Sequence, residues 1–413
     1  MKDVGNLEYV KKLNRLNILN LIRENHEMSR QDIAKKTGLT PAAITGIVRE
    51  LVQRGNVTEI GLGESNGGRR PIKLQFNAET GYVVGVEITR NQTTIGIVDL
   101  QAKPVKIIEL QIDMTDPKEG LSALKKSIDT LILETGIPQE KLMGAGFALP
   151  GLYDRKSKTI KHSPNLGEKW RNVPIKDWLQ EVITVPFFIE HNSNAAALAE
   201  YTLGRGKLVK DLAYVNLGEG FSAGVIMNDR ILYGSQGYAG EMGHVVIVEN
   251  GPLCNCGNKG CLESLYAVPA LVRKANNELA LYQEMDLLKQ IWRESGQVTI
   301  EDIITCSTKV DSYAWQLIQQ AGWYIGTGVA NLINFYNPEM VVLGGILAGG
   351  GSVIMEPLIQ SMNAHAFPEI AKNTKVEISS IGRHAPFYGA CIVAINKLFL
   401  ADRTENFLSM TAF

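Results

Sequence analysis

Three of the chain's five cysteines lie within eight positions, and a histidine precedes them by ten. The four residues follow the spacing H-x9-C-x-C-x4-C and are His244, Cys254, Cys256 and Cys261. Three thiolates and one imidazole form the ligand set of a closed, tetrahedral structural zinc site. Gly257 and Gly260 allow the chain to fold tightly around an ion. The spacing therefore favours one structural Zn²⁺ per chain over a redox-active thiol pair or free buried cysteines.

Two carboxylates flank this cluster. Glu241 precedes His244 by three positions, and Glu263 follows Cys261 by two. A metal site that fixes both ends of the segment also fixes these side chains, and rigid carboxylates are good acceptors for the vicinal hydroxyls of a sugar. Two ordinary surface glutamates would have the same spacing, so the spacing alone leaves both interpretations open.

The N-terminal residues have the pattern of a helix-turn-helix. Apolar residues recur at helical spacing from Val10 to Ile22, which predicts a first helix. Ser29 followed by Asp32 is typical of a capping box that begins a second helix, and Gly38 suits the position after its end. A third helix follows this turn, which is the place of a recognition helix in the major groove of DNA.

The third helix and the hairpin after it hold most of the predicted DNA contacts. Thr40 can cap the helix, and Thr45 and Arg49 on its open face can reach base edges or phosphates. The hairpin contains Gly-Gly-Arg-Arg-Pro, which suits a wing that enters a narrow minor groove. A three-helix bundle with a solvated hairpin is the alternative. The predicted DNA-binding residues are Ser29, Arg30, Thr40, Pro41, Ala42, Ala43, Thr45, Arg49, Gly68, Arg69 and Arg70.

The charge is distributed unevenly. Residues 1–77 carry 13 Lys/Arg and 8 Asp/Glu, a net of +5, and the whole chain has a net charge of −1, so the remainder carries −6. A basic head on an acidic body points to a polyanion such as double-stranded DNA, although small domains reach this charge by chance.

The composition is that of a globular protein, with 45% hydrophobic and 21% charged residues. At 413 residues the chain is long enough for two or three domains. No apolar run reaches the roughly 18 residues of a membrane span, and the start lacks the apolar centre of a signal peptide. We expect a cytoplasmic protein with no membrane insertion.

The body repeats one pattern of elements. Residues 82–113 predict a three-stranded meander that is followed by a helix and a buried strand, and residues 211–234 begin the same succession again. This duplication predicts an α/β architecture with a cleft between two lobes. The expected domains are a DNA-binding head at residues 1–77, a first lobe at 78–195, and a second lobe at 196–413 with the zinc site and C-terminal helices.

The two hairpin turns of these meanders face each other in actin-like kinases, where they hold nucleotide phosphates. The first turn here has Thr89 but no glycine, and the second has Glu219 between Gly218 and Gly220. A carboxylate that faces a triphosphate is repulsive unless a metal lies between them. Both turns are poor phosphate sites.

These segments together resemble the ROK family, named for repressors, open reading frames and kinases. The matching stretches are GYAGEMGHVVIVENGPLCNCGNKGCLE, IEHNSNAAALAE, HSPNLGEKW and the head that ends in GGRRPIKL. The resemblance covers essentially the whole chain. It implies a winged helix-turn-helix followed by a two-lobed, actin-like (ribonuclease-H-like) sugar-kinase fold of the α/β class, with a zinc-binding segment. The sugar contacts that it implies are Asn165, His191, Asn192, Glu241, His244 and Glu263.

The chain departs from the kinases of that family at two places. They carry Asp-Gly-Gly-Thr in the first phosphate turn, where this chain has Glu87 and Thr89. They also carry a catalytic aspartate at the position of Asn192. An amide is a poor proton acceptor, and losing a general base costs about 10²–10⁴-fold in rate. We therefore expect no catalytic residues and no enzyme activity, while Asn192 can still bind a sugar hydroxyl.

Three functions follow. The favoured one is a sugar-responsive repressor of carbohydrate uptake or catabolism genes that binds operator DNA as a homodimer or tetramer. The second is an active sugar kinase with an added DNA-binding head, and the third is a binding module controlled by a sugar-transport protein. The sequence does not select the sugar, since members that respond to xylose and to N-acetylglucosamine share the pattern.

Overall fold

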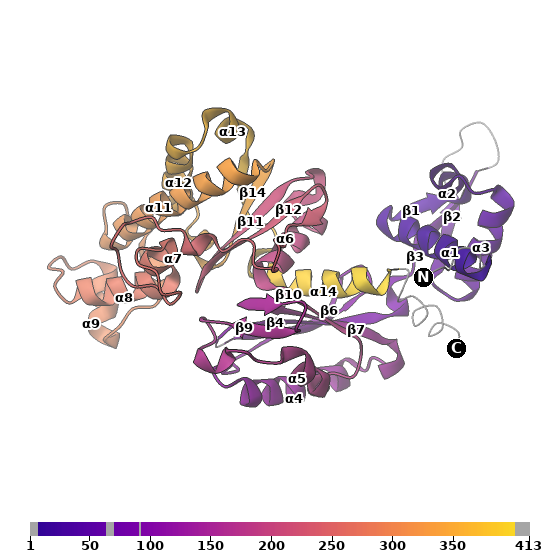
Figure 1. The fold of residues 1–413 in the computed structure, drawn as a ribbon, viewed down its shortest axis with the longest axis horizontal. Coiled ribbons are helices and arrows are strands. Elements are labelled where there is room, and N and C mark those ends of the chain that lie inside the picture. Colours follow the sequence, from indigo (N-terminus) through magenta and orange to yellow (C-terminus); the bar gives the residue numbers. More distant parts are fainter. Residues whose placement is uncertain (1–6, 63–69, 91, 401–413) are drawn as a thin grey trace.

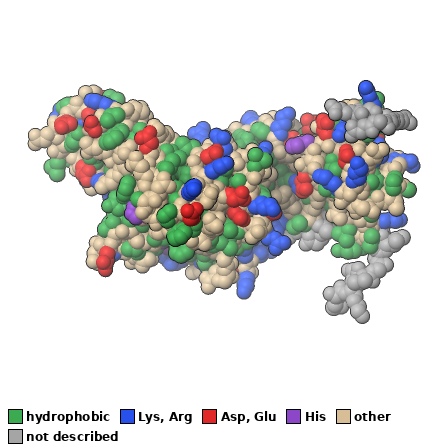
Figure 2. Space-filling model, turned by 90° about the horizontal axis from the view of Figure 1, so that it is seen from above, with side chains coloured by type: hydrophobic (Ala, Val, Ile, Leu, Met, Phe, Trp, Pro, Cys, Tyr) green, Lys and Arg blue, Asp and Glu red, His purple; other side chains and the backbone are tan. Residues whose placement is uncertain are grey.

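The computed structural model describes residues 7–62, 70–90 and 92–400. A small head lies at one end, and two α/β lobes form the body (Figure 1). Charged side chains of both signs are interspersed over the face in Figure 2. Among the described residues, no helix is both long and apolar enough to cross a membrane.

The head contains three helices and a three-stranded sheet in the order β1-β3-β2. Its elements are α1 (Leu7–Glu24), β1 (Glu27–Ser29), α2 (Arg30–Thr37), α3 (Pro41–Gln53), β2 (Val57–Leu62) and β3 (Ile72–Phe76). The predicted caps are confirmed: Ser29 and Asp32 form a reciprocal capping box, and Gly38 ends α2 in the left-handed conformation with φ of 70°. Ile44, Val48 and Leu51 of α3 are fully buried. The short strand β1 was not predicted.

The first lobe is built on a five-stranded sheet in the order β10-β7-β4-β5-β6. Its helices α4 and α5 lie together below the sheet in Figure 1. The elements are β4 (Tyr82–Ile88), β5 (Thr93–Asp99), β6 (Pro104–Leu110), α4 (Pro117–Thr135), β7 (Leu142–Leu149), β8 (Leu152–Asp154), β9 (Thr159–His162), α5 (Ile175–Val182) and β10 (Phe187–His191). The next helix, α6 (Asn192–Thr202), packs more against the sheet of the second lobe than against this one.

The second lobe repeats this topology with a sheet in the order β15-β14-β11-β12-β13. In both sheets the meander is antiparallel and the two later strands are parallel to its first strand, so the predicted duplication is confirmed. The elements are β11 (Leu212–Leu217), β12 (Phe221–Met227), β13 (Arg230–Ile231), α7 (Leu262–Tyr266), α8 (Val268–Leu279), α9 (Leu287–Ser295), α10 (Ile300–Cys306), α11 (Tyr313–Tyr336), β14 (Met340–Gly344), α12 (Ser352–His365), α13 (Pro368–Asn373), β15 (Lys375–Ile378) and α14 (Ala385–Leu398).

Helix α14 is the central element of the body. It packs against α6 and against β4, β7 and β10 of the first sheet. A Cβ on Gly389 of α14 would lie 1.7 Å from the carbonyl oxygen of Ala195, so only glycine permits this approach of α14 to α6. The helix therefore belongs to the packing of both lobes, although the prediction placed it in the second. The predicted boundary after residue 195 also falls inside α6. The division into three domains stays a prediction.

The end of α14 forms a joint with the head. The Phe399 ring lies edge-on to Phe76, with 5.8 Å between ring centroids, and the Arg23 guanidinium lies 4.6 Å from the Phe399 centroid. Asn20 Nδ2 also donates to the Phe399 carbonyl at 3.4 Å. At its N-terminal end, α14 follows η7 (Gly382–His384), which lies beside the cleft between the lobes. Helix α14 thus runs from residues that line the cavity to the head, and Figure 1 shows its course beside the first sheet.

Candidate functional site

A cavity of about 680 Å³ lies between the two sheets. Its lining comes from β4 and the β4–β5 turn, the β11–β12 turn, the start of α6, and the segment that precedes α7. All six residues of the predicted sugar set line it: Asn165, His191, Asn192, Glu241, His244 and Glu263. The structure therefore brings together side chains that are almost one hundred positions apart in sequence.

The four predicted metal ligands form one cluster at the edge of this cavity. Their ligand atoms all lie within 4.8 Å of one another. Cys254 Sγ is 3.6 Å from His244 Nδ1, and Cys256 Sγ is 3.7 Å from Cys261 Sγ. Gly260 makes the fold of this loop possible, because its φ is 75° and a Cβ there would lie 1.7 Å from the Val248 carbonyl oxygen. The cluster could hold a metal ion.

His244 faces both the cysteines and the cavity. Its Nδ1 points toward Cys254, and its Nε2 lies 3.8 Å from a carboxylate oxygen of Glu241. An ion bound through Nδ1 leaves Nε2 on the side of the cleft. The same ring thus connects the cysteine cluster to the carboxylate that the sequence places three residues earlier.

Glu263 and Asn165 meet at Gly220 of the β11–β12 turn. Glu263 Oε2 accepts a hydrogen bond from the Phe221 amide at 2.9 Å. A Cβ on Gly220 would lie 2.6 Å from both Asn165 Nδ2 and Glu263 Oε2. Burial raises the pKa of Glu263, and the nearby His244 opposes that shift. The turn therefore approaches these two side chains as closely as a glycine allows.

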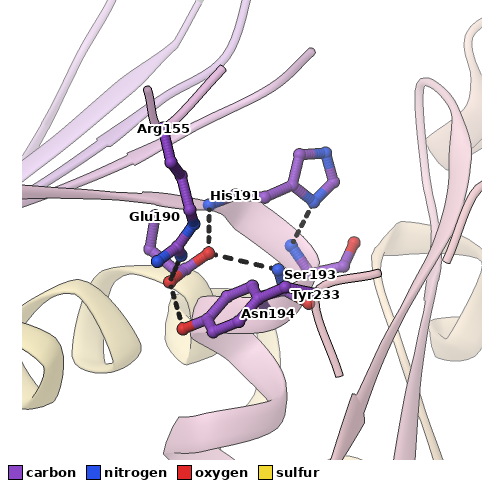
Figure 3. A network of polar contacts seen from close by, with 6 residues as sticks. All are labelled: Arg155, Glu190, His191, Ser193, Asn194 and Tyr233. Carbon is purple, nitrogen blue, oxygen red and sulfur yellow. Dashed lines mark hydrogen bonds and ion pairs between the residues drawn. The ribbon is translucent and has the colours of Figure 1, made fainter. Parts of the chain in front are cut away.

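A buried carboxylate positions the start of α6 (Figure 3). Glu190 Oε1 accepts from the His191 amide at 3.0 Å and from Asn194 Nδ2 at 3.1 Å. Its Oε2 accepts from Tyr233 Oη at 2.9 Å and from the Arg155 guanidinium, which lies 3.6 Å from the Tyr233 ring centroid. The network joins the β8–β9 hairpin, the β10–α6 junction and the segment after β13. Sequence reasoning missed Glu190 and Arg155.

His191 and Asn192 are oriented by this junction. His191 Nδ1 accepts from the Ser193 amide at 3.3 Å, and burial lowers the His191 pKa, which favours the neutral ring. Asn192 Nδ2 donates to the Ile88 carbonyl at 3.3 Å, and its buried Oδ1 has no partner among the described residues. An acceptor without a partner at a cavity wall suits a ligand hydroxyl.

The β4–β5 and β11–β12 segments that line the cavity carry acidic side chains. Burial, together with the nearby Glu109, raises the pKa of Glu87 on β4 to about 8. Thr89 Oγ1 donates to the Gln92 carbonyl at 2.7 Å, so this hydroxyl is already engaged. Glu219 is exposed between Gly218 and Gly220. The second predicted phosphate turn thus carries a carboxylate at its tip.

The head presents most of the predicted DNA-binding residues to solvent. The residues of and before α3 that are exposed are Thr40, Pro41, Ala42, Ala43, Thr45 and Arg49, and Arg70 is exposed before β3. Arg30 is half-buried in an ion pair of 2.7 Å with Glu59. Gly68 and Arg69 lie outside the described residues.

Ser29 is a correction to the predicted DNA contacts. It is only 2% exposed, and its hydroxyl donates to Asp32 Oδ2 at 2.7 Å within the capping box. The prediction that this side chain contacts DNA does not fit its burial, because the same cap that begins α2 encloses the hydroxyl.

Family models match both parts of the chain. The ROK family model matches residues 83–397. The chain belongs to the ROK family. A winged helix-turn-helix DNA-binding model matches residues 12–58, which contain α2 and α3 of this ROK protein.

Relatives of this ROK protein are similar over nearly the whole chain. The "Xylose repressor" of Bacillus subtilis (strain 168) is 31% identical over 396 residues, which cover 95% of this chain and 98% of that protein. The "DNA-binding transcriptional dual regulator NagC" of Escherichia coli (strain K12) is 30% identical over 411 residues, which cover 98% of both.

Solved ROK structures share the fold. A ROK family transcriptional regulator described as a homologue of the Escherichia coli MLC protein superposes with a TM-score of 0.81 at 25% identity, over 97% of this chain and 100% of that chain. A Streptomyces griseus ROK glucokinase in complex with glucose and AMPPNP gives 0.66 at 25% identity, over 76% of this chain and 100% of that chain. The regulator thus matches the head as well as the body.

Proposed function

We propose that this ROK protein is a sugar-responsive transcriptional repressor of carbohydrate uptake or catabolism genes. The observation that carries the proposal is the path of α14, which begins beside a cleft lined by the predicted sugar set and ends against the winged head. A ligand that changes the conformation of the cleft could therefore act on the head through α14. The full-length similarity to two proteins named as a repressor and a transcriptional regulator supports the same function.

The metal of the cysteine cluster is Zn²⁺ in this proposal. With Zn–S near 2.3 Å and Zn–N near 2.0–2.1 Å, tetrahedral geometry requires ligand atoms about 3.5–3.8 Å apart. The two pairs measured here are separated by 3.6 and 3.7 Å. His244, Cys254, Cys256 and Cys261 would hold the ion, which would keep the segment between Glu241 and Glu263 in one conformation.

Sugar binding without phosphotransfer is the second part of the proposal. Asn192 occupies the position of the catalytic base of the kinases that the chain resembles, and an amide is a poor base. Its unpaired Oδ1 supports a role as a hydrogen-bond acceptor. The cleft residues Asn165, His191, Asn192, Glu241, His244 and Glu263 would bind the sugar. ATP-dependent phosphorylation of a sugar would contradict this part and favour the kinase alternative.

The remaining parts concern DNA and assembly. We infer that double-stranded operator DNA binds α3 and the wing of the head at residues 1–77, and that two or four copies assemble in the cytoplasm. A sugar-transport protein is the alternative controlling partner. Fluorescence anisotropy of the full chain on DNA from its own promoter, titrated with a panel of sugars, tests the proposal. Release of the DNA by one sugar is expected, and indifference to every sugar would favour a protein partner.

Gly220→Ala should weaken sugar binding. The new Cβ would displace Asn165 and Glu263, and losing two hydrogen bonds raises the dissociation constant roughly 10- to 100-fold. Isothermal titration calorimetry with the inducing sugar measures this change. Gly218→Ala is the matched control in the same turn, because its Cβ would meet Asn216 at an ordinary 3.4 Å. Equal affinities of the two variants would contradict the placement of the sugar beside this turn.

Phe399→Ala should separate sugar binding from DNA release. Phe399 is 3% exposed and its ring joins α14 to Phe76 and Arg23, so its truncation removes the ring contacts of the joint while leaving the cleft intact. The sugar should bind with unchanged affinity, but at least about tenfold more sugar should be needed to release DNA, a coupling loss of about 1.4 kcal/mol. Lys397→Ala, on the exposed side of the same helix, should respond normally. A normal response of Phe399→Ala would exclude this joint as the route.

A further inference from the structure

Three polar side chains join the two lobes beside the cleft, and we call this group the clasp (Figure 3). It consists of Arg155 in the β8–β9 hairpin, Glu190 on β10 and Tyr233 in the segment after β13. Arg155 and Glu190 belong to the first lobe, and Tyr233 belongs to the second. The Tyr233 hydroxyl donates to Glu190 Oε2 at 2.9 Å, and the Arg155 guanidinium lies 3.6 Å from the centroid of the same tyrosine ring. The clasp therefore bridges the lobes.

The segment that carries Tyr233 is fixed to the second sheet at both of its ends. The Leu232 amide donates to the Val225 carbonyl of β12 at 2.8 Å. The Ala223 amide, also of β12, donates to the Gly240 carbonyl at 2.7 Å. A Cβ on Gly240 would lie 1.9 Å from the Ala223 carbonyl oxygen, so only glycine permits this close approach. Tyr233 is therefore a rigid part of the second lobe.

The other half of the clasp is fixed to the first lobe. Glu190 is paired in register with Ala148 of the parallel strand β7, and the hairpin that carries Arg155 packs against β10. The hairpin also meets the second-lobe segment at another position. A Cβ on Gly237 would lie 3.6 Å from the Tyr153 carbonyl oxygen and 3.8 Å from Arg155 Cδ. The two lobes are therefore neighbours over a short stretch and not at one atom pair only.

The clasp lies beside the predicted sugar set without entering the cavity. The cavity wall continues from each of its three segments, to Asn165 after the hairpin, to His191 after β10 and to Glu241 after the second-lobe segment. The three clasp side chains, which all lie in the described part of the chain, do not line the cavity. A ligand in the cleft would thus touch the walls that the clasp joins but not the clasp itself.

Separating the lobes would break favourable contacts of a buried charge. The Glu190 side chain is only 4% exposed, and it would lose the hydrogen bond from Tyr233. Arg155 would lose the face of the tyrosine ring. Hydrogen bonds to ionised groups and cation–π contacts are both stronger when they are shielded from water. Burial, together with the nearby Glu190, raises the pKa of Tyr233, so its hydroxyl remains a donor.

We propose that the clasp holds the cleft closed and thereby sets the rate at which the effector enters and leaves. This inference rests on the proposed function, because it concerns the regulation of the same site. Movement of two lobes apart is a hinge motion that must break the contacts between them. Because the clasp does not touch the ligand, it stabilises the closed cleft equally with and without a sugar. Its strength therefore cancels from the dissociation constant and appears in both rate constants.

Tyr233→Phe tests the clasp, since it removes the hydroxyl and keeps the ring beside Arg155. Stopped-flow intrinsic fluorescence of the full chain with xylose, glucose and N-acetylglucosamine gives both rate constants. For a sugar that binds the wild type, association and dissociation should both accelerate roughly tenfold, as expected from the loss of one hydrogen bond to a charged group, while the dissociation constant changes less than about threefold. Tyr238→Phe is the matched control in the same segment and should leave both rates unchanged.

The association rate distinguishes a clasp from a merely structural role. Damage to the sugar site would accelerate dissociation alone and weaken binding, and that result for Tyr233→Phe would overturn the inference. Rate constants equal to those of the wild type would overturn it as well. Either result leaves the sugar-responsive function intact, because the sugar still binds.

A second measurement requires no sugar. Spin labels attached through p-acetylphenylalanine at the exposed positions Lys176 on α5 and Asn277 on α8 report the separation of the lobes and leave the cysteine cluster untouched. Tyr233→Leu, which removes the hydroxyl and the aromatic ring, should add a population with a longer distance between the labels. Tyr238→Leu should not. Identical distance distributions in Tyr233→Leu and the wild type would overturn the clasp. Binding of none of the three sugars would instead contradict the proposed function, and the label distances would still decide on the clasp.

Discussion

Replacing Arg49 and Arg70 with alanine together is expected to abolish specific binding to operator DNA. Arg49 is exposed on α3, the predicted recognition helix, and Arg70 is exposed two positions before β3. Neither forms an ion pair with another described residue, whereas Arg15, Arg30 and Arg54 pair with Glu50 or Glu59. An arginine at a base edge contributes about 1–3 kcal/mol, so the pair accounts for roughly 30- to 10⁴-fold in affinity.

Fluorescence anisotropy at several salt concentrations measures this loss. The slope of log affinity against log salt should fall by about one for each arginine that contacts a phosphate. Sugar-induced thermal stabilisation should persist, because both residues are far from the cleft. Arg293→Ala, on α9 of the second lobe, is the control for a simple change in net charge. Operator affinity that survives the double substitution would refute the roles of α3 and the wing.

We expect that replacing Cys256 with serine releases the Zn²⁺ ion proposed for the cluster and, with it, the response to sugar. Cys256 Sγ lies 3.7 Å from Cys261 Sγ and is exposed at the cavity, so the serine hydroxyl removes one ligand without changing the surrounding packing. A metal present at 1,000 times its dissociation constant stabilises a fold by about 4 kcal/mol, and this contribution should disappear. Glu241 and Glu263 would lose the anchor between them.

Elemental analysis gives the direct measurement, with about one zinc per chain expected for the wild type and almost none for the variant. Calorimetry with the inducing sugar should show binding weakened by 10-fold or more, as roughly expected when support for a metal site is lost. Cys306→Ala, a buried cysteine outside the cluster, should keep its zinc. Full zinc content in Cys256→Ser, or normal induction of a zinc-free protein, would show that the cluster has another purpose.

The features that the sequence could predict are those encoded within a few positions. The capping box of Ser29 and Asp32, the left-handed Gly38 and the cluster from His244 to Cys261 each depend on short spacing, and the structure places each of these groups together. The duplicated meander was predictable for the same reason, since each copy is a local succession of strands. The six sugar-set residues came from the family resemblance, because no spacing joins Asn165 to Glu263.

The features that could not be predicted depend on distant parts of the chain. Glu190 is an acidic residue in a strand, and only the fold shows that Arg155 and Tyr233 converge on it. Ser29 was assigned to two roles because a hydroxyl that caps a helix and a hydroxyl that contacts DNA have the same sequence pattern. The joint at Phe399 was missed because an aromatic residue near a helix end carries no signal of its partner.

The joint between head and body also has a consequence for how the protein is made. Asn20 and Phe399 are 379 positions apart, so the ribosome completes the head long before it adds the residue on which the head docks. Domains near the N-terminus fold first during synthesis. A nascent or prematurely terminated chain would therefore carry a folded DNA-binding head with no connection to the sugar cleft. On the proposed route through α14, such a chain would lack the response to sugar, because its head would have no contact with the end of that helix.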